Sequence, residues 1–280
     1  KTGIIIDQNY RRSYIEKNIK KFSLKKNLNP ILKDSLIEEV TNIVEKPNII
    51  LCTFNKKYLD MPDEIIVSTI ENHQKFFLVY DKNNHLINHF FIVADCEDKK
   101  GLIKKGNERV IEARLSDADY FWKLNKSKNM IKQVFKLQKI NYFNGLGNYF
   151  DKVQRLKKIG GILSDELLIS KEKVEIASTI CKVDLLSDLV SEFPELQGIV
   201  GGYFAEAQGF EKEVSNAVRE HYLPTGNNSK VPKKSYSVAL SVSDRVDTLV
   251  GFFGLNLIPT SSKDPYALRR VANGLTKIII

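Results

Sequence analysis

Carboxylates and arginines lie close together near the C-terminal end of this chain. Asp244 and Asp247 are three residues apart with Arg245 between them, and Arg269 and Arg270 follow farther along. Arginine binds phosphate and carboxylate alike through two parallel hydrogen bonds. Each of these arginines could contact a polyanion or form an internal salt bridge, and for any single one we expect the salt bridge. As a set, beside a formal net charge of +9, they indicate some contact with an RNA backbone.

Residues that could activate a nucleophile or hold a metal are scattered. His85 and His89 flank an expected hairpin and are predicted at the surface, and no histidine lies between His89 and His221. His73 is expected to pack at a helix end. No serine lies in a nucleophile elbow, and there is no P-loop lysine. The glycines of 198–202 could cradle a phosphate, but we expect them to let helices pack closely. We therefore predict no catalytic residue in this chain.

Two helices must position the aspartates and arginines. The first has an apolar stripe at i, i+4, i+7 and i+11, formed by Val242, Val246, Leu249 and Phe253. It should end near Gly251–Gly254, because glycine favours helix C-termini. After a loop, Asp264 and Pro265 are expected to open the second helix, since aspartate caps free amides and proline suits the first helical position. Its predicted buried face consists of Leu268, Val271, Leu275 and Ile279.

The remaining pattern changes in character along the chain. The first ~95 residues alternate helix and strand, with these predicted elements: a β run at 3–7, a basic helix at 10–22, a helix from Asn29-Pro30, a strand at 48–54, a helix at 61–73, and a hairpin of 76–80 with 86–94. After Ala94 we expect only helices: 107–122, 133–162 with a break at 145–147, a central helix at 173–193, and a stripe of Phe210, Val214, Ala217 and His221. The sequence therefore predicts an α+β fold with an α/β module at 1–105 and an all-helical domain at 106–280.

Composition places the chain among globular proteins. It has 280 residues, 42% hydrophobic and 28% charged, enough for a sizeable core and two domains. No apolar run approaches the ~20 residues of a membrane span, so no membrane association is expected. Three well-separated cysteines indicate reduced thiols in a cytoplasmic protein. The chain begins without methionine and ends on isoleucines within a helical pattern, so we expect an excised fragment.

Five collinear blocks carry a family resemblance. They resemble segments of the β subunit of bacterial heterotetrameric glycyl-tRNA synthetase, and are SDRVDTLVGFFGLNLIPTSSKDPYALRR at 243–270, VTNIVEKPNIILCTFNKKYLDMPDEIIVSTIENHQKFF at 40–77, GNERVIEARLSDADYFW at 106–122, LSDLVSEFPELQGIVGGYFAEAQG at 186–209 and EHYLP at 220–224. Lys46 departs from the family's tryptophan, and Gly202 stands where arginine is frequent. The chain is similar to the central part of that subunit.

The resemblance implies that two subunits carry out different parts of the reaction. Glycine activation, with ATP and magnesium, would take place on a separate α subunit, and this chain would need no cofactor of its own. The β subunit would support ligation of glycine to tRNA-Gly by binding tRNA and associating with the α subunit. The first module would correspond to a phenylalanyl-tRNA-synthetase-β-like region, and an anticodon-binding domain would follow residue 280. The fragment alone would be catalytically silent.

The resemblance also implies that the helical domain is of the HD-phosphohydrolase type. An active HD site needs a histidine, a His-Asp pair and a later aspartate to hold a divalent metal. Asp184 and Asp244 match the two aspartates, but Val183 replaces the paired histidine and Lys152 lies near the first ligand. We predict no bound metal and expect both aspartates to be capping or ion-paired residues. The alternatives are a metal-dependent HD phosphohydrolase and a non-enzymatic RNA-binding scaffold.

Eight cations within the family-like stretches are the candidate RNA contacts. They are Arg109, Arg114, Lys152, Arg155, Arg245, Lys263, Arg269 and Arg270.

Overall fold

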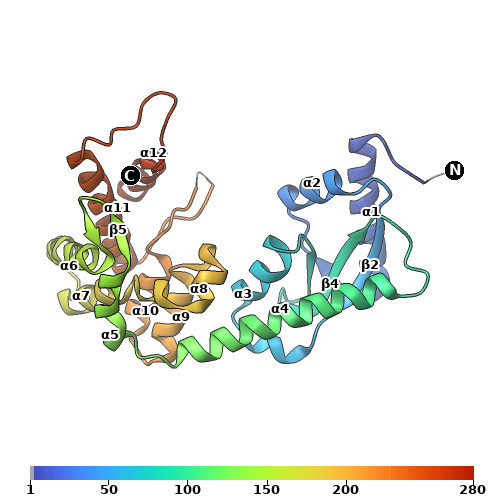
Figure 1. The fold of residues 1–280 in the computed structure, drawn as a ribbon, viewed down its shortest axis with the longest axis horizontal. Coiled ribbons are helices and arrows are strands. Elements are labelled where there is room, and N and C mark those ends of the chain that lie inside the picture. The colour runs from blue at the N-terminus through green and yellow to red at the C-terminus, as the bar shows by residue number, and fades with distance from the viewer. Residues whose placement is uncertain (1–2, 227) are drawn as a thin grey trace. The chain divides into compact units, whose positions relative to one another are not determined.

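The chain divides into two compact units (Figure 1). The computed structural model describes residues 3–226 and 228–280. The first unit ends at Trp122 and the second begins at Lys123. The sequence placed this boundary at 105, but helix α4 (Leu102–Lys126) runs through that position. Its buried residues Ile111, Leu115, Ala118 and Trp122 match the predicted inward face, so residues 106–122 belong to the first unit.

The first unit is built on a four-stranded antiparallel sheet in the order β1-β3-β4-β2. The strands are β1 (Asn29–Pro30), β2 (Asn48–Thr53), β3 (Phe77–Tyr80) and β4 (Leu86–Ala94). The predicted hairpin is the β3–β4 pair, and β2 pairs with β4 from Asn48↔Ala94 to Thr53↔His89. Helices and sheet together confirm the α+β class.

Two helices cover this sheet. Helices α1 (Gln8–Lys26) and α2 (Asp34–Ile43) bury apolar side chains against it. The resulting core contains Ile15, Ile19, Ile37, Val40, Phe77 and Phe91. Next along the chain lies the 3₁₀ turn η1 (Lys56–Asp60). The helix predicted at 61–73 follows as α3 (Asp63–Val67), which continues without a break into the π-helical turn η2 (Ser68–Asn72).

Two expectations for this unit were wrong. The helix predicted from Asn29-Pro30 begins only at Asp34, because Asn29 and Pro30 pair with β3 as the edge strand β1. Proline fits a sheet edge because it lacks an amide to donate. The predicted β run at 3–7 is not a strand. Its Ile5 amide donates a single hydrogen bond to the Glu45 carbonyl at 2.9 Å.

The second unit is a bundle of helices around α11 (Ser235–Gly254). Helix α11 packs against four other helices: α6 (Tyr149–Glu166), α7 (Lys171–Ile180), α10 (Lys212–Glu220) and α12 (Leu268–Ile279). The remaining helices and turns are α5 (Met130–Gln133), η3 (Val134–Lys139), η4 (Val183–Leu186), α8 (Asp188–Glu192), η5 (Pro194–Leu196) and α9 (Ile199–Ala207). In the described part of the chain, no helix is long and apolar enough to span a membrane.

Two predictions fail in this unit. The expected all-helical domain contains a small hairpin, β5 (Asn141–Phe143) with β6 (Gly147–Asn148). Glycine permits it, because Gly145 and Gly147 have φ values of 87° and 79°. The central helix predicted at 173–193 is three pieces, α7, η4 and α8. The chain turns between them where it buries Lys182 and Asp184.

Of the two helix ends predicted near the C-terminus, one lies where it was expected and the other is displaced. Helix α11 ends at Gly254, as predicted. The side chain of Asp264 accepts hydrogen bonds from the Leu268 and Arg269 amides at 2.8 and 2.9 Å. It therefore acts as the expected cap, although α12 begins only at Leu268.

The predicted apolar stripe of α11 is not its buried face. Val242, Val246 and Leu249 are only half-buried, and Phe253 is 46% exposed. The fully buried positions include charged and small polar residues, namely Ser237, Ser241, Ser243, Asp244, Arg245 and Asp247. The helix thus turns a polar face into the bundle, and that face forms the candidate site.

Close packing of α9 on α10 yields the first prediction. A Cβ atom at Gly202 would lie 2.9 Å from both the Ser215 carbonyl oxygen and Arg219 Cα. This agrees with the expectation that the glycines of 198–202 let helices approach. We expect Gly202→Ala to lower the free energy of unfolding by about 1–3 kcal/mol through overpacking, measured by urea denaturation. Gly254→Ala, whose Cβ would have no atom within 4 Å, is the matched control. Equal stability of both variants would contradict the prediction.

Candidate functional site

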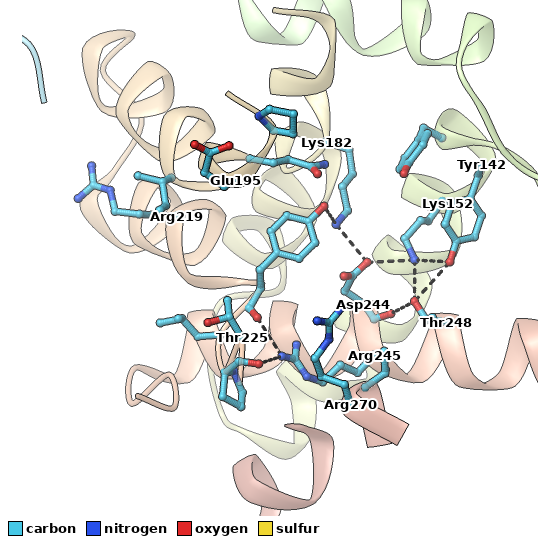
Figure 2. Close-up of a pocket in the computed structure, with 18 residues that line it drawn as sticks. Tyr142, Lys152, Lys182, Glu195, Arg219, Thr225, Asp244, Arg245, Thr248 and Arg270 are labelled. Carbon is cyan, nitrogen blue, oxygen red and sulfur yellow. Dashed lines mark hydrogen bonds and ion pairs between the residues drawn. The ribbon is translucent and has the colours of Figure 1, made fainter. Parts of the chain in front are cut away.

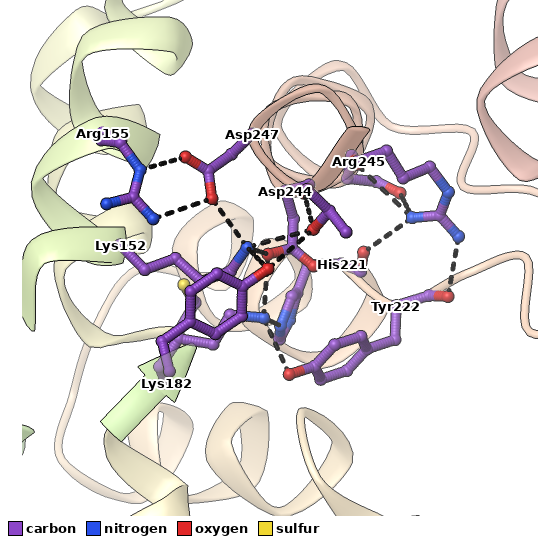
Figure 3. Close-up of polar contacts among 12 residues, drawn as sticks. Lys152, Arg155, Lys182, His221, Tyr222, Asp244, Arg245 and Asp247 are labelled. Atoms are coloured by element: carbon purple, nitrogen blue, oxygen red, sulfur yellow. Dashed lines mark hydrogen bonds and ion pairs between the residues drawn. The ribbon is translucent and has the colours of Figure 1, made fainter. Parts of the chain in front are cut away.

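The polar face of α11 is organised around the carboxylate of Asp244. Its Oδ1 lies 3.0 Å from Lys152 Nζ on α6 and 3.2 Å from Lys182 Nζ, which follows α7 (Figure 3). Lys152 is 2% exposed, Lys182 1% and Asp244 7%. Two ammonium groups so close would repel each other strongly in a buried setting. Asp244 makes their burial possible by interacting with both.

Asp247, one turn farther along α11, extends the network towards the surface. Its Oδ2 accepts a hydrogen bond from Lys152 at 2.9 Å, and its Oδ1 accepts one from Arg155 Nε at 2.5 Å. Lys152 also donates to Thr248 and Tyr142, at 3.2 and 3.3 Å. Each N–H of Lys152 therefore has a partner within the protein.

Lys182 also has three polar partners within the protein. Besides Asp244, it contacts the Tyr222 hydroxyl at 2.8 Å and His221 Nε2 at 2.9 Å. The other ring nitrogen of His221 lies 2.6 Å from the Val218 carbonyl oxygen. A carbonyl can only accept, so Nδ1 carries the proton and Nε2 accepts from Lys182. Burial first, and then the Lys182 charge, lower the pKa of His221 to about 3, so this histidine is neutral.

The charges of the network are fixed by their neighbours. Burial alone would raise the pKa of Asp244, but the ammonium groups of Lys152 and Lys182 hold it well below its ordinary value. Burial would lower the pKa of both lysines, and Asp244 instead raises it. Burial also raises the pKa of the adjacent Cys181 thiol to about 12. Neither a free amine nor a thiolate is therefore present as a nucleophile.

Asp184 has a separate role. It is 1% exposed, and its Oδ2 accepts hydrogen bonds from the Gly198 and Gly201 amides at 2.6 and 3.2 Å. Burial raises its pKa to about 6. Asp184 therefore joins η4 to the start of α9, while Asp244 is ion-paired, as the sequence led us to expect for both.

The metal site that an HD fold implies does not fit these residues. Asp244 faces two ammonium groups, which would repel a divalent cation. Among the described residues, no group of three or more His, Cys, Asp or Glu side chains could hold a metal.

Arg245 holds backbone in place. Its guanidinium donates to the carbonyl oxygens of Tyr222 at 3.0 Å and Pro224 at 2.9 Å, and to Ser241 Oγ at 2.8 Å. Gly274 of α12 packs directly on it, because a Cβ there would lie 2.8 Å from Arg245 Nε. Arg245 thus ties the segment after α10 and helix α12 to α11.

A cavity of about 460 Å³ opens beside this network (Figure 2). Its wall includes Tyr142, Tyr149, Tyr222, Lys152, Lys182, Asp244, Arg245 and Arg270. Most of these cations already have internal partners. Arg270, which is exposed, has no ion-pair partner among the residues described. Among the described residues of this wall, the paired lysines and Asp244 provide neither a free base nor a nucleophile.

The structure separates the eight candidate RNA contacts into two groups. Three of them, Lys152, Arg155 and Arg245, are buried or half-buried and engaged with carboxylates or carbonyls. The others are exposed, apart from half-buried Arg114: Arg109, Lys263, Arg269 and Arg270. Arg109 and Arg114 lie in the first unit and the rest in the second. Arg269 also donates to the Thr260 carbonyl.

The eight candidates do not include the cations of helix α1, which the sequence identified only as a basic helix at 10–22. Helix α1 carries seven lysines and arginines and a single acidic residue, Glu16. Its strongly basic composition was visible in the sequence, but the candidates were chosen only from family-like stretches.

Removing the central carboxylate should destabilise the helical unit. Asp244→Asn leaves two buried ammonium groups without their shared counter-ion, and we expect a loss of about 3–5 kcal/mol at pH 7. Because the folded pKa of Asp244 is depressed, its contribution is complete above the unfolded pKa of about 4 and declines as pH falls further. The difference from the unmutated chain should therefore shrink below about pH 4. Denaturation across this range measures it, with exposed Asp165→Asn as the control.

Metal analysis tests the same site independently. We expect purified protein to contain no stoichiometric zinc, manganese or iron, since the groups facing Asp244 are cations. Elemental analysis by mass spectrometry checks this, and a metal that disappears in Asp184→Asn and Asp244→Asn variants would contradict it.

Comparison with known proteins places the chain in a family. The family model described as "Glycyl-tRNA synthetase beta subunit" matches residues 1–280. The chain is 39% identical to the glycine–tRNA ligase beta subunit of Thermodesulfovibrio yellowstonii, covering 100% of the chain and 42% of that protein. It is 37% identical to the subunit of Stutzerimonas stutzeri and 38% identical to that of Streptococcus uberis, covering 99% of the chain and 41% of each protein. The chain thus spans about two fifths of the relatives it matches, and it belongs to the glycyl-tRNA synthetase beta subunit family.

Proposed function

We propose that this chain acts within a β subunit that supports ATP-dependent ligation of glycine to tRNA-Gly, by contacting tRNA and associating with a catalytic α subunit. The observation that carries the proposal is the family match over the whole chain, together with relatives named as glycine–tRNA ligase beta subunits. ATP and magnesium would be bound by the α subunit, and no cofactor by this chain. Its place of action would be the cytoplasm.

The buried network supports a non-catalytic role for the helical unit. Its lysines are charged and engaged by internal partners, His221 is neutral, and Asp244 and Asp247 are ion-paired. Such a network fixes helices in place and supplies no reacting group. Within this proposal the helical unit is an HD-like domain in which ammonium groups take the place of the metal's charge.

The exposed cations near α12 are the part of this unit suited to tRNA. Lys263, Arg269 and Arg270 lie on the loop before α12 and on its first turn, and all three are exposed. Arginine and lysine at a surface can neutralise RNA phosphates, and each neutralised phosphate releases counter-ions. Binding there would be salt-sensitive and largely independent of base sequence.

The proposal is tested by reconstitution. We expect the α subunit with the full-length β subunit to aminoacylate tRNA-Gly, and the α subunit with this chain alone to be inactive. Glycylation measured with radiolabelled glycine distinguishes the mixtures. Activity of this chain without the α subunit would contradict the assignment of chemistry to the partner.

Charge reversal near α12 tests the tRNA contact itself. In the full-length β subunit, Arg269→Glu with Arg270→Glu should weaken tRNA binding. The slope of log affinity against log salt should decrease by roughly 0.7–0.9 for each phosphate that is no longer neutralised. Fluorescence anisotropy at several salt concentrations measures both, and thermal melting checks the fold. Lys230→Glu with Lys233→Glu, also exposed, is the matched control. A folded variant with unchanged affinity and slope would remove both arginines from the RNA site.

A further inference from the structure

Much of the chain's positive charge is concentrated on helix α1. Its 19 residues contain seven cations and one carboxylate, whereas the whole chain has a net charge of +9. The helix owes its position to Ile15, Ile19 and Ser23, which are buried. These fix which side faces the sheet and leave most of the cations outside.

The cations of α1 differ in how far they are neutralised. Arg11 donates to the Thr41 and Ile5 carbonyls, and Arg12 pairs with Glu16 and Asp34. Five lysines remain exposed, and within the described part of the chain no carboxylate oxygen lies within 4.0 Å of them: Lys17, Lys20, Lys21, Lys25 and Lys26. In the network around Asp244, by contrast, the lysines are matched by carboxylates.

Three of these lysines, Lys21, Lys25 and Lys26, border a groove. It has a volume of about 310 Å³ and lies between α1 and the start of β2. Its wall consists of Tyr14, Asn18, Lys21, Phe22, Lys25, Lys26, Pro47, Asn48 and Ile49. The wall contains three lysines and two aromatic rings but no carboxylate. Tyr14 is 38% exposed, so part of its ring is open to a ligand.

Helix stability alone does not account for this pattern. Lys25 and Lys26 lie in the last turn, where cations interact favourably with the helix dipole. Lys17 and Lys21 lie earlier, and the spacing of Lys17, Lys21 and Lys25 is i, i+4, i+8. Like charges at that spacing destabilise a helix slightly. An anion bound along the row would remove the repulsion.

We propose that the groove between α1 and β2 binds the phosphodiester backbone of an RNA strand, with a base stacked on Tyr14. The row of lysines advances about 6 Å per step along the helix axis, so an extended polyanion can meet several of them in succession. A cationic groove with aromatic side chains is the usual arrangement for binding single-stranded nucleic acid. The groove therefore suits RNA better than an acidic protein surface. This inference rests on the proposed function, for which it names a second tRNA contact.

The test uses the full-length β subunit with its α subunit. The main variant is Lys17→Glu, Lys21→Glu and Lys25→Glu, and the control reverses three equally exposed lysines, Lys132, Lys136 and Lys139. The probe is fluorescently labelled tRNA-Gly, with affinity measured by anisotropy over a range of salt concentrations. We expect the main variant to raise Kd at least tenfold and to lower the salt slope by about 2, from roughly 0.7–0.9 for each phosphate left without its lysine. The control variant should change both the Kd and the salt slope less than the main variant does.

A second variant separates stacking from charge. Tyr14→Ala should weaken binding about fivefold or more without changing the salt slope, because no charge is removed. If the triple Lys→Glu variant has a lowered melting temperature, a variant with Gln at the same three positions replaces it. We expect that variant to lower the salt slope by a smaller but still detectable amount.

Two results would overturn the inference. One is a folded triple variant with unchanged affinity and slope. The other is unchanged tRNA binding together with failure to associate with the α subunit, which would identify the groove as a site for an acidic protein. In either case, glycylation by the unmutated complex would still support the proposed function. If the unmutated complex failed to glycylate tRNA-Gly, the proposed function itself would be refuted.

Discussion

The helical unit depends on one carboxylate placed between two buried ammonium groups. Asp244 on α11 meets Lys152 from α6 and Lys182 from the end of α7. Burying such charges is costly unless every one is paired and hydrogen-bonded. The three segments must therefore lie in register for these buried charges to be paired. This requirement explains why the chain breaks after α7, where Lys182 and Asp184 turn inward, and does not continue as one long helix.

The same requirement explains which part of this unit the sequence could predict. Periodicity correctly identified α11 and its end at Gly254. A period of 3.6 shows that one face differs from the other, but it does not show which face is buried. Apolar residues were assigned to the core, yet Asp244, Arg245 and Asp247 occupy it. Their partners lie far away in the sequence, at Lys152, Arg155 and the backbone around Pro224, so no local pattern predicts that they are buried.

Sequence patterns predicted the structure correctly where residues close together in the sequence determine it. Turn-forming residues predicted the β3–β4 hairpin, and the apolar spacing of 111, 115, 118 and 122 predicted the buried face of α4. The unit boundary was harder to place, because α4 continues without interruption through residue 105. The small β5–β6 hairpin was missed for a related reason. Its two strands are only three and two residues long, too short for an alternating pattern to develop.

Cations in this chain fall into two classes that the sequence does not distinguish. Lys152 and Lys182 are enclosed and paired, so salt screens them little. The lysines of α1 are exposed and have no ion-pair partner among residues 3–226 and 228–280, so their interactions weaken as ionic strength rises. A motif preserves residue types for either reason, and arginine or lysine within a motif is therefore poor evidence of a binding surface. Exposure and the absence of a nearby carboxylate are the properties that make a cation available to RNA. By these properties α1, which no motif singled out, is the better candidate for an RNA contact than the buried lysines beside Asp244.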